Sequence, residues 1–94
     1  MSAGTRLRRA LAASARAAGC TVRMEDAVEQ PWSSATFVGT RHRIVLEARA
    51  SVAFTTWLAN IAAADLAMPG QVIADIKGER SGDFILVTAL TLEA

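Results

Sequence analysis

The strongest periodic pattern of large apolar side chains lies between residues 51 and 68. These side chains recur at spacings of three, four and seven, which is the period of an amphipathic helix with one apolar stripe. Pro69 and Gly70 then end the helix, because proline lacks an amide donor and glycine permits a reversal of the chain. The sequence therefore predicts a helix over residues 51–68. The residues on the stripe are Phe54, Trp57, Leu58, Ile61 and Met68.

Another helix is expected at the start of the chain, from a cap at Ser2 or Thr5 to about Ala18, with Gly19 as the stop. Because helical residues are about 100° apart, its apolar and basic side chains fall on opposite sides. The apolar side carries Leu7, Leu11, Ser14, Ala15 and Ala18, and the basic side carries Arg6, Arg9 and Arg16.

Residues 20–26 alternate strictly between apolar and polar positions, which is typical of a half-buried strand. Cys20, Val22 and Met24 should face inward, so Cys20 is expected to be a small core residue rather than a reactive thiol. Residues 27–34 break this alternation around Pro31 and are expected to form a loop or an irregular edge.

The runs SATFV and RHRIVLE predict a hairpin with Gly39 and Thr40 as its two-residue turn, because glycine at the first central position suits a type II′ turn. In this register His42 pairs with Phe37 and points toward the core. The flanking side chains, Arg41 and Arg43, point outward. A slip of one residue would invert every assignment.

The runs QVIADIKGE and DFILVTALTLE predict a second hairpin, joined near residues 80–82. Its last strand, residues 83–93, is apolar on both faces, which is not the pattern of a strand that is wet on one side. Two helices cover only one face of such a sheet. We therefore expect the other face to be covered, and a second copy of the chain is the simplest candidate.

These elements follow one another in the order α-β-β-β-α-β-β. We predict a single α+β domain over residues 1–94, built as a two-layer sandwich. Its mostly antiparallel sheet has about five strands, and both helices lie on one face. The pattern leaves the strand order open, although the doubly apolar C-terminal strand suits a central position.

The net charge of +1 hides an uneven distribution. Residues 1–24 carry five arginines and no acid, a charge of +5, whereas residues 25–94 carry five bases and nine acids, a charge of −4. This asymmetry has two readings, an anionic partner or a solvated helix face. An acid-free, arginine-rich start is also typical of a mitochondrial transit peptide, although Leu7, Leu11 and Ala18 fit a domain helix.

No stretch is apolar over the roughly 18 residues that a membrane span needs, and a lone cysteine cannot form an internal disulfide. The sequence thus predicts a cytoplasmic protein without a membrane partner. One histidine, one cysteine and no tyrosine leave no zinc-type cluster, and no nucleotide-binding or metalloprotease motif is present. We therefore expect no metal, no cofactor and no enzymatic activity.

Two groups of residues remain as site candidates. Arg41 and Arg43, joined by the first-helix arginines Arg6, Arg9 and Arg16, are candidates for binding phosphate or carboxylate groups. The alternative reading is that these arginines simply solubilise exposed faces. Nucleic acid is possible as a partner but not favoured, because the chain has few aromatic side chains on which bases could stack.

His42 and Asp75 are polar candidates for the core or for a pocket. Asp75 lies in step with Ile73 and Lys77, so it is either a partly buried carboxylate or part of a wet strand face. His42 is either a core imidazole, bonded to a carbonyl or to Asp75, or half of an acid–base pair with Asp75. Asp65 is expected at the edge of the second helix, beside an arginine of the first.

The segments PWSSATFVGTRHRI, MPGQVIADI and FILVTALTLEA resemble small bacterial proteins in families with no assigned function. This resemblance implies no catalytic or binding residue. The RHR triplet also resembles that of the BolA proteins, whose fold is like type II KH domains. There the triplet begins a helix, however, whereas here it runs into the strand sequence IVLE.

Three hypotheses follow for function. The first is a non-catalytic cytoplasmic module that forms a homodimer and binds a protein or a small ligand. The second is a module for RNA or other anions that uses the arginines named above. The third is an enzyme that uses His42 and Asp75.

Overall fold

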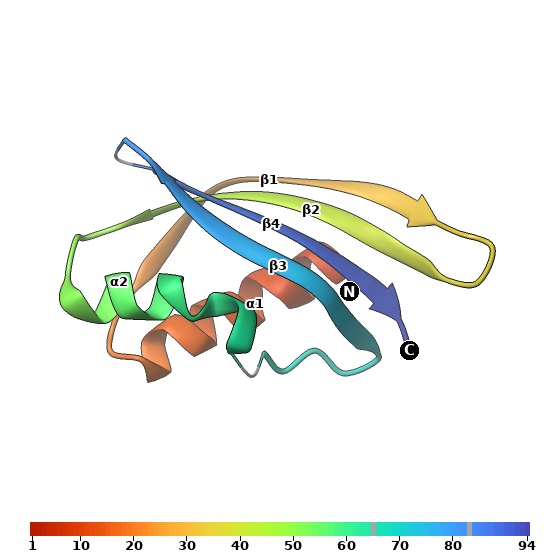
Figure 1. The fold of residues 1–94 in the computed structure, drawn as a ribbon, viewed down its shortest axis with the longest axis horizontal. Helices are drawn as coiled ribbons and strands as arrows, with labels where there is room; N and C mark the ends of the chain where they lie inside the picture. Colours follow the sequence, from red (N-terminus) through yellow and green to blue (C-terminus); the bar gives the residue numbers. More distant parts are fainter. Residues whose placement is uncertain (65, 83) are drawn as a thin grey trace.

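The computed structural model describes residues 1–64, 66–82 and 84–94, and within them it shows two α-helices packed on one face of a four-stranded antiparallel sheet (Figure 1). In chain order the elements are α1 (Ala3–Ala17), β1 (Val22–Ser33), β2 (Val38–Ala48), α2 (Val52–Ala59), the short 3₁₀ helix η1 (Ile61–Ala63), β3 (Gln71–Ser81) and β4 (Phe84–Glu93).

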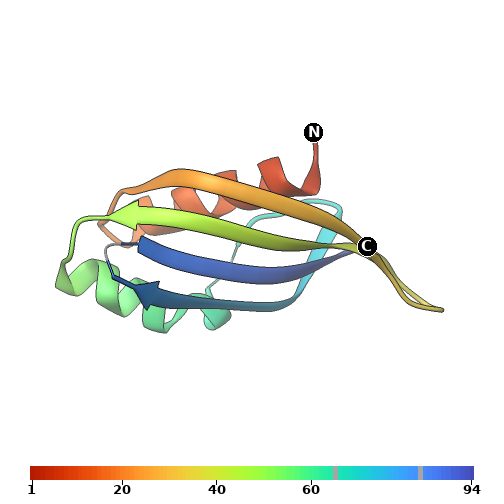
Figure 2. The same ribbon diagram turned by 90° about the horizontal axis from the view of Figure 1, so that it is seen from above.

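The strands lie side by side in the order β1-β2-β4-β3, and Figure 2 shows them in front of the helices. The prediction of an α+β fold with both helices on one face is confirmed. The doubly apolar C-terminal strand, β4, lies between β2 and β3, in the central position that its pattern suits.

The expected count of about five strands was wrong, because β1 takes in the first predicted strand and the residues after it, whereas the second predicted strand, residues 34–38, is almost entirely the loop before β2. β1 continues from Val22 through the predicted loop to Ser33 and pairs with β2 along its length. The strand accommodates the broken alternation with a bulge between Met24 and Asp26. It also accommodates Pro31, because β1 is an edge strand and the missing amide donor costs no ladder bond there.

The hairpin between β1 and β2 therefore turns earlier than the Gly39-Thr40 turn we expected. Its loop spans residues 34–37, closed by the Ser34 amide, which donates to the Phe37 carbonyl at 2.8 Å. Gly39 lies inside β2, where a Cβ would collide with the Thr91 carbonyl of β4. Phe37 consequently lies in the loop and does not face His42.

The first helix is confirmed, whereas the predicted helix over residues 51–68 was too long. Ser2 caps α1 and Ser51 caps α2, each accepting from the amide three residues on. α2 ends at Ala59, and the side-chain amide of Asn60 donates to the Thr56 carbonyl at 2.8 Å. Met68 reaches the core from the connection to β3 rather than from the helix.

The core fills the space between the helices and the sheet. The fully buried side chains with the largest volume are Phe54, Leu7, Leu11, Ile44, Leu46, Ile85, Val87 and Thr91. Cys20, just before β1, packs against this core, as expected, and its thiol donates to the Ala15 carbonyl at 3.2 Å. Burial raises the pKa of the Cys20 thiol.

Candidate functional site

The candidate site is the face of the sheet that points away from α1 and α2, which we call the bare face (Figure 2). The pairing of the strands arranges its side chains in five rows, each crossing β1, β2, β4 and β3 in that order. The first row is Arg23, Glu47, Phe84 and Ser81; the second Asp26, Val45, Leu86 and Glu79; the third Val28, Arg43, Thr88 and Lys77; the fourth Gln30, Arg41, Leu90 and Asp75; the fifth Trp32, Gly39, Leu92 and Val72.

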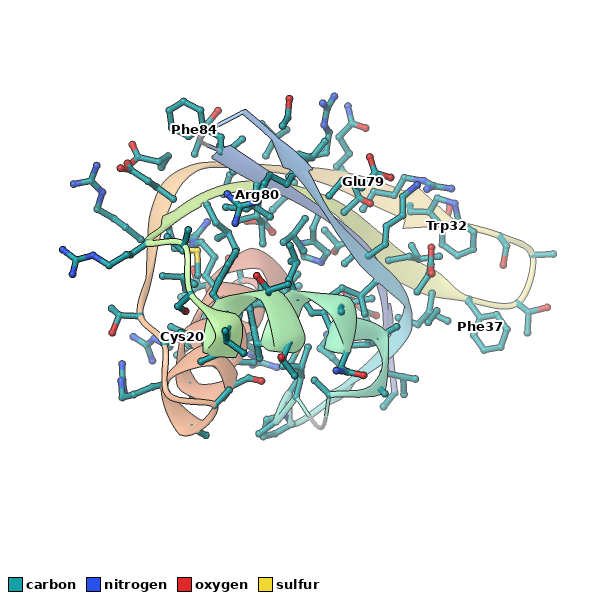
Figure 3. The ribbon with its side chains drawn as sticks, turned by 60° about the vertical axis from the view of Figure 1, so that its left-hand side comes forward. Cys20, Trp32, Phe37, Glu79, Arg80 and Phe84 are labelled. Atoms are coloured by element: carbon teal, nitrogen blue, oxygen red, sulfur yellow. The ribbon has the colours of Figure 1, made fainter. Side chains whose placement is uncertain are left out.

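An apolar column runs along β4 on this face. It consists of Phe84, Leu86, Leu90 and Leu92, interrupted by Thr88. Figure 3 shows Phe84 at one end of the sheet and Trp32 at the other. Phe84 is 47% exposed, so this end of the column presents apolar surface to solvent.

A shallow hollow of about 740 Å³ lies over the middle rows of the bare face. Its lining combines aliphatic side chains of β1, β2 and β4 with charged ones of β1, β2 and β3. The charged and amide residues around it are Asp26, Gln30, Arg41, Arg43, Asp75 and Lys77. The hollow therefore contains Arg41 and Arg43, two of the five arginines that the sequence singled out, together with Asp75.

The charges on this face are partly paired. Arg23 bonds Glu47 at 2.7 Å, and Lys77 lies 3.5 Å from Glu79. Arg41 and Arg43 form no ion pair within the described residues. The hydrogen bonds that Arg23 donates to the Glu25 and Glu47 carboxylates raise the pKa of Arg23.

The first-helix arginines do not join Arg41 and Arg43. Arg6, Arg9 and Arg16 belong to α1, which covers the opposite face of the sheet. Arg6 donates to the Pro69 carbonyl at 3.0 Å, so its guanidinium ties α1 to the connection before β3. The five arginines thus form two separate groups with the sheet between them.

His42 faces the core, as the sequence predicted, and only 2% of its surface is exposed. Its Nε2 lies 2.8 Å from the Thr91 Oγ1, while its Nδ1 has no hydrogen-bond partner among the described residues. The pKa of His42 is lowered, mainly by burial. The charge of Glu29 raises this pKa in part, and the charge of Arg8 lowers it.

Asp75 is exposed on the bare face, so the structure does not bring it to His42. The predicted in-step arrangement with Ile73 was also wrong, because a bulge between Ile73 and Asp75 shifts the register. Ile73 instead packs against the core, while Asp75 and Lys77 share the bare face. The acid–base pair has no geometric basis here.

One polar contact that the sequence did not indicate holds α1 on the sheet. The Glu29 carboxylate of β1 accepts from the Gly4 amide at 3.1 Å and from the Ser2 hydroxyl at 3.3 Å. A Cβ on Gly4 would occupy the place of this carboxylate. No local pattern links residues 25 positions apart, and the sequence pattern places Glu29 in a loop or an irregular edge.

Asp65 lies outside the described residues. Among the described residues, no group of three or more histidine, cysteine, aspartate or glutamate side chains is arranged to hold a metal ion. No helix in these parts of the chain combines the length and hydrophobicity needed to span a bilayer. No protein-family model, curated protein or solved structure matches the chain.

Proposed function

We propose that the protein is a non-catalytic cytoplasmic module that acts by self-association, with the bare face as its interface. The apolar column of β4 carries this proposal. Leu86 and Leu90 stand in the middle of the face, flanked by charged strands, which is the anatomy of an interface with an apolar centre and a polar rim. The one histidine, which is buried, supports a role other than acid–base chemistry.

Charge balance favours a second copy as the occupant of this face. The five rows carry four cations, Arg23, Arg41, Arg43 and Lys77, and four acids, Asp26, Glu47, Asp75 and Glu79. Glu25, which pairs with Arg23 at 2.7 Å in the bulge beside the first row, adds a fifth acid, so the net charge is −1. A face so close to neutral does not attract a strongly anionic or cationic surface. Another face with both signs interspersed, such as that of a second copy, offers opposite charges to its cations and to its acids.

The size of the face is compatible with a small, stable interface. Four strands about 4.8 Å apart and five rows about 6.8 Å apart cover roughly 650 Å² in plan. Standing side chains raise the accessible area above this figure. Standard interfaces bury about 800 Å² per partner, and weaker ones about 600 Å².

The test is the molar mass in solution. We expect light scattering after size exclusion to give a dimer at tens of micromolar, and Leu86→Asp to give a folded monomer. Val52→Asp is the matched control, because Val52 is 85% exposed on α2, in the other layer. A wild-type monomer, or a Leu86→Asp dimer, would contradict the proposal. A charge on the other face of β4, as in Val87→Asp, is unsuitable for this test. Val87 is fully buried in the core, so a buried carboxylate there is expected to unfold the chain.

A second candidate function is anion binding in the hollow. It is favoured by Arg41 and Arg43, which form no ion pair within the described residues, and by Lys77 in the same row as Arg43. Binding of single-stranded RNA or inorganic phosphate should then weaken steeply with salt, and Arg41→Ala with Arg43→Ala should reduce it. Absent or salt-independent binding excludes this function.

A further inference from the structure

We infer that two copies pack bare face to bare face about a two-fold axis that crosses the strands between the second and third rows. The inference rests on the self-association proposed above and specifies its geometry. Each strand then lies over its own counterpart. The first row faces the partner's fourth row, and the second row faces the partner's third row.

Like charges exclude the other two-fold arrangements that lay strands along strands and overlap over three rows or more. An axis across the fourth row would stack Arg41 on the partner's Arg41. An axis across the third row would stack Arg43 and Lys77 on the same residues of the partner subunit. An axis between the third and fourth rows would stack Arg43 on the partner's Arg41. An axis across the second row would stack Asp26 on the partner's Asp26.

Axes parallel to the strands fail for the same reason wherever three strands or more overlap. An axis between β2 and β4 would place Asp26 over the partner's Glu79. An axis along β2 would place Arg43 over the partner's Arg43, and an axis along β4 would place it over the partner's Lys77. Such contacts between like charges oppose association.

The remaining arrangement brings opposite charges together. Arg41 lies over the partner's Glu47, and Lys77 lies over the partner's Glu79. By symmetry each contact occurs twice. Packed sheets are about 10 Å apart, so long side chains from both copies meet between them.

The apolar column fits the same arrangement. Phe84 lies over the partner's Leu90, and Leu86 lies over the partner's Thr88. The fifth row and the tip of the β1–β2 hairpin extend past the partner's first row. Phe37, which is 50% exposed at that tip, stays outside the contact (Figure 3).

Two single variants, studied separately and mixed, test this geometry. Lys77→Glu gives a chain with acids at positions 77 and 79, and Glu79→Lys gives a chain with lysines at both. Each variant alone should dimerise at least about tenfold more weakly than the wild type, because two like-charge contacts form per dimer. A mixture should form a heterodimer with nearly wild-type affinity, since every contact between the mixed chains then joins opposite charges.

Native mass spectrometry and light scattering of the separate and mixed variants give the result. If the mixture shows no preference for the heterodimer, β3 does not lie over the partner's β3 and this geometry is wrong. A dimeric wild type would in that case still support self-association. A monomeric wild type overturns both. Phe37→Ser is the control: it should leave the dimer affinity unchanged within about twofold, and its dissociation of the dimer would contradict the arrangement.

Discussion

His42 and Thr91 form a hydrogen bond inside the core, 2.8 Å long, between adjacent strands β2 and β4. Both side chains are almost fully buried, and the second imidazole nitrogen has no partner among the described residues. A buried neutral imidazole of this kind contributes to stability only while it remains neutral, because a charged one would lose its hydration. The contact therefore makes the fold sensitive to acid.

We expect the free energy of unfolding to fall as the pH drops below about 6.5, the value of a free imidazole. Burial lowers the pKa of His42 in the folded state, so the unfolded chain binds its proton first. The stabilisation by neutral His42 is thus complete above the pKa that His42 has in the unfolded chain. It is lost progressively as the pH falls toward the pKa in the folded protein, by at most about 1.4 kcal/mol per pH unit.

Urea unfolding at several pH values between 5 and 7 measures this dependence. His42→Gln removes the titrating group, so the slope of its unfolding free energy against pH should be close to zero in this window. A His42→Gln protein with the wild-type slope would show that another group carries the acid sensitivity.

Because Gly4 contacts Glu29, the effect of Gly4→Ala on stability should depend on whether Glu29 is present. Gly4→Ala favours the helix by up to about 1 kcal/mol. It also displaces the Glu29 carboxylate from the first turn of α1, which costs a similar amount. We expect Gly4→Ala to be nearly neutral in the wild type and stabilising in a Glu29→Ala background.

The coupling energy from this double-mutant cycle should be about 1 kcal/mol, measured by urea unfolding. Glu93→Ala is the control background, because Glu93 lies at the end of β4 and makes no hydrogen bond with α1 within the described residues. Equal effects of Gly4→Ala in the Glu29→Ala and Glu93→Ala backgrounds would mean that the contact between the Gly4 amide and the Glu29 carboxylate does not contribute to stability.

The sequence predicted the faces of β2 and β4 correctly because their alternation is local. Ile44 and Leu46 define the inner face of β2, so His42 falls inward and Arg41 outward wherever the hairpin turns. The parts we missed depend on contacts across the sheet. By sequence, Gly39 looks like a turn residue, but in the fold it is glycine because the Thr91 carbonyl of β4 leaves no room for a side chain.

The candidate site was predictable to the same extent. Arg41 and Arg43 were assigned to the outer face of their strand, and they lie on the bare face. Their separation from the arginines of α1 was not predictable, because it depends on which face the helix covers. Asp75 lies on an exposed strand face, one of its two predicted positions, but its in-step relation with Ile73 was wrong because a bulge shifts the strand register by one residue.

Gly39→Ala tests this account of the hairpin. The added Cβ meets the backbone carbonyl of Thr91, which cannot move without separating β2 from β4. We expect a loss of about 2–4 kcal/mol in the free energy of unfolding. Thr36→Ala, in the exposed loop, should change it by less than about 0.5 kcal/mol. A mild effect of Gly39→Ala would show that the strands tolerate the side chain.

The two helices are joined by the indole of Trp57, whose Nε1 donates to the Ser14 Oγ at 2.9 Å. Ser14→Ala improves helix propensity in α1 by about 0.5 kcal/mol, but it leaves a buried indole N–H without its partner, which costs about 1–3 kcal/mol. We therefore expect Ser14→Ala to destabilise the wild type. In a Trp57→Phe background, where no N–H remains to be satisfied, the same exchange should be neutral or slightly stabilising. Thermal or urea unfolding of the four proteins in this cycle decides the matter, since a purely structural role of the Trp57 ring would make the effect of Ser14→Ala identical in both backgrounds.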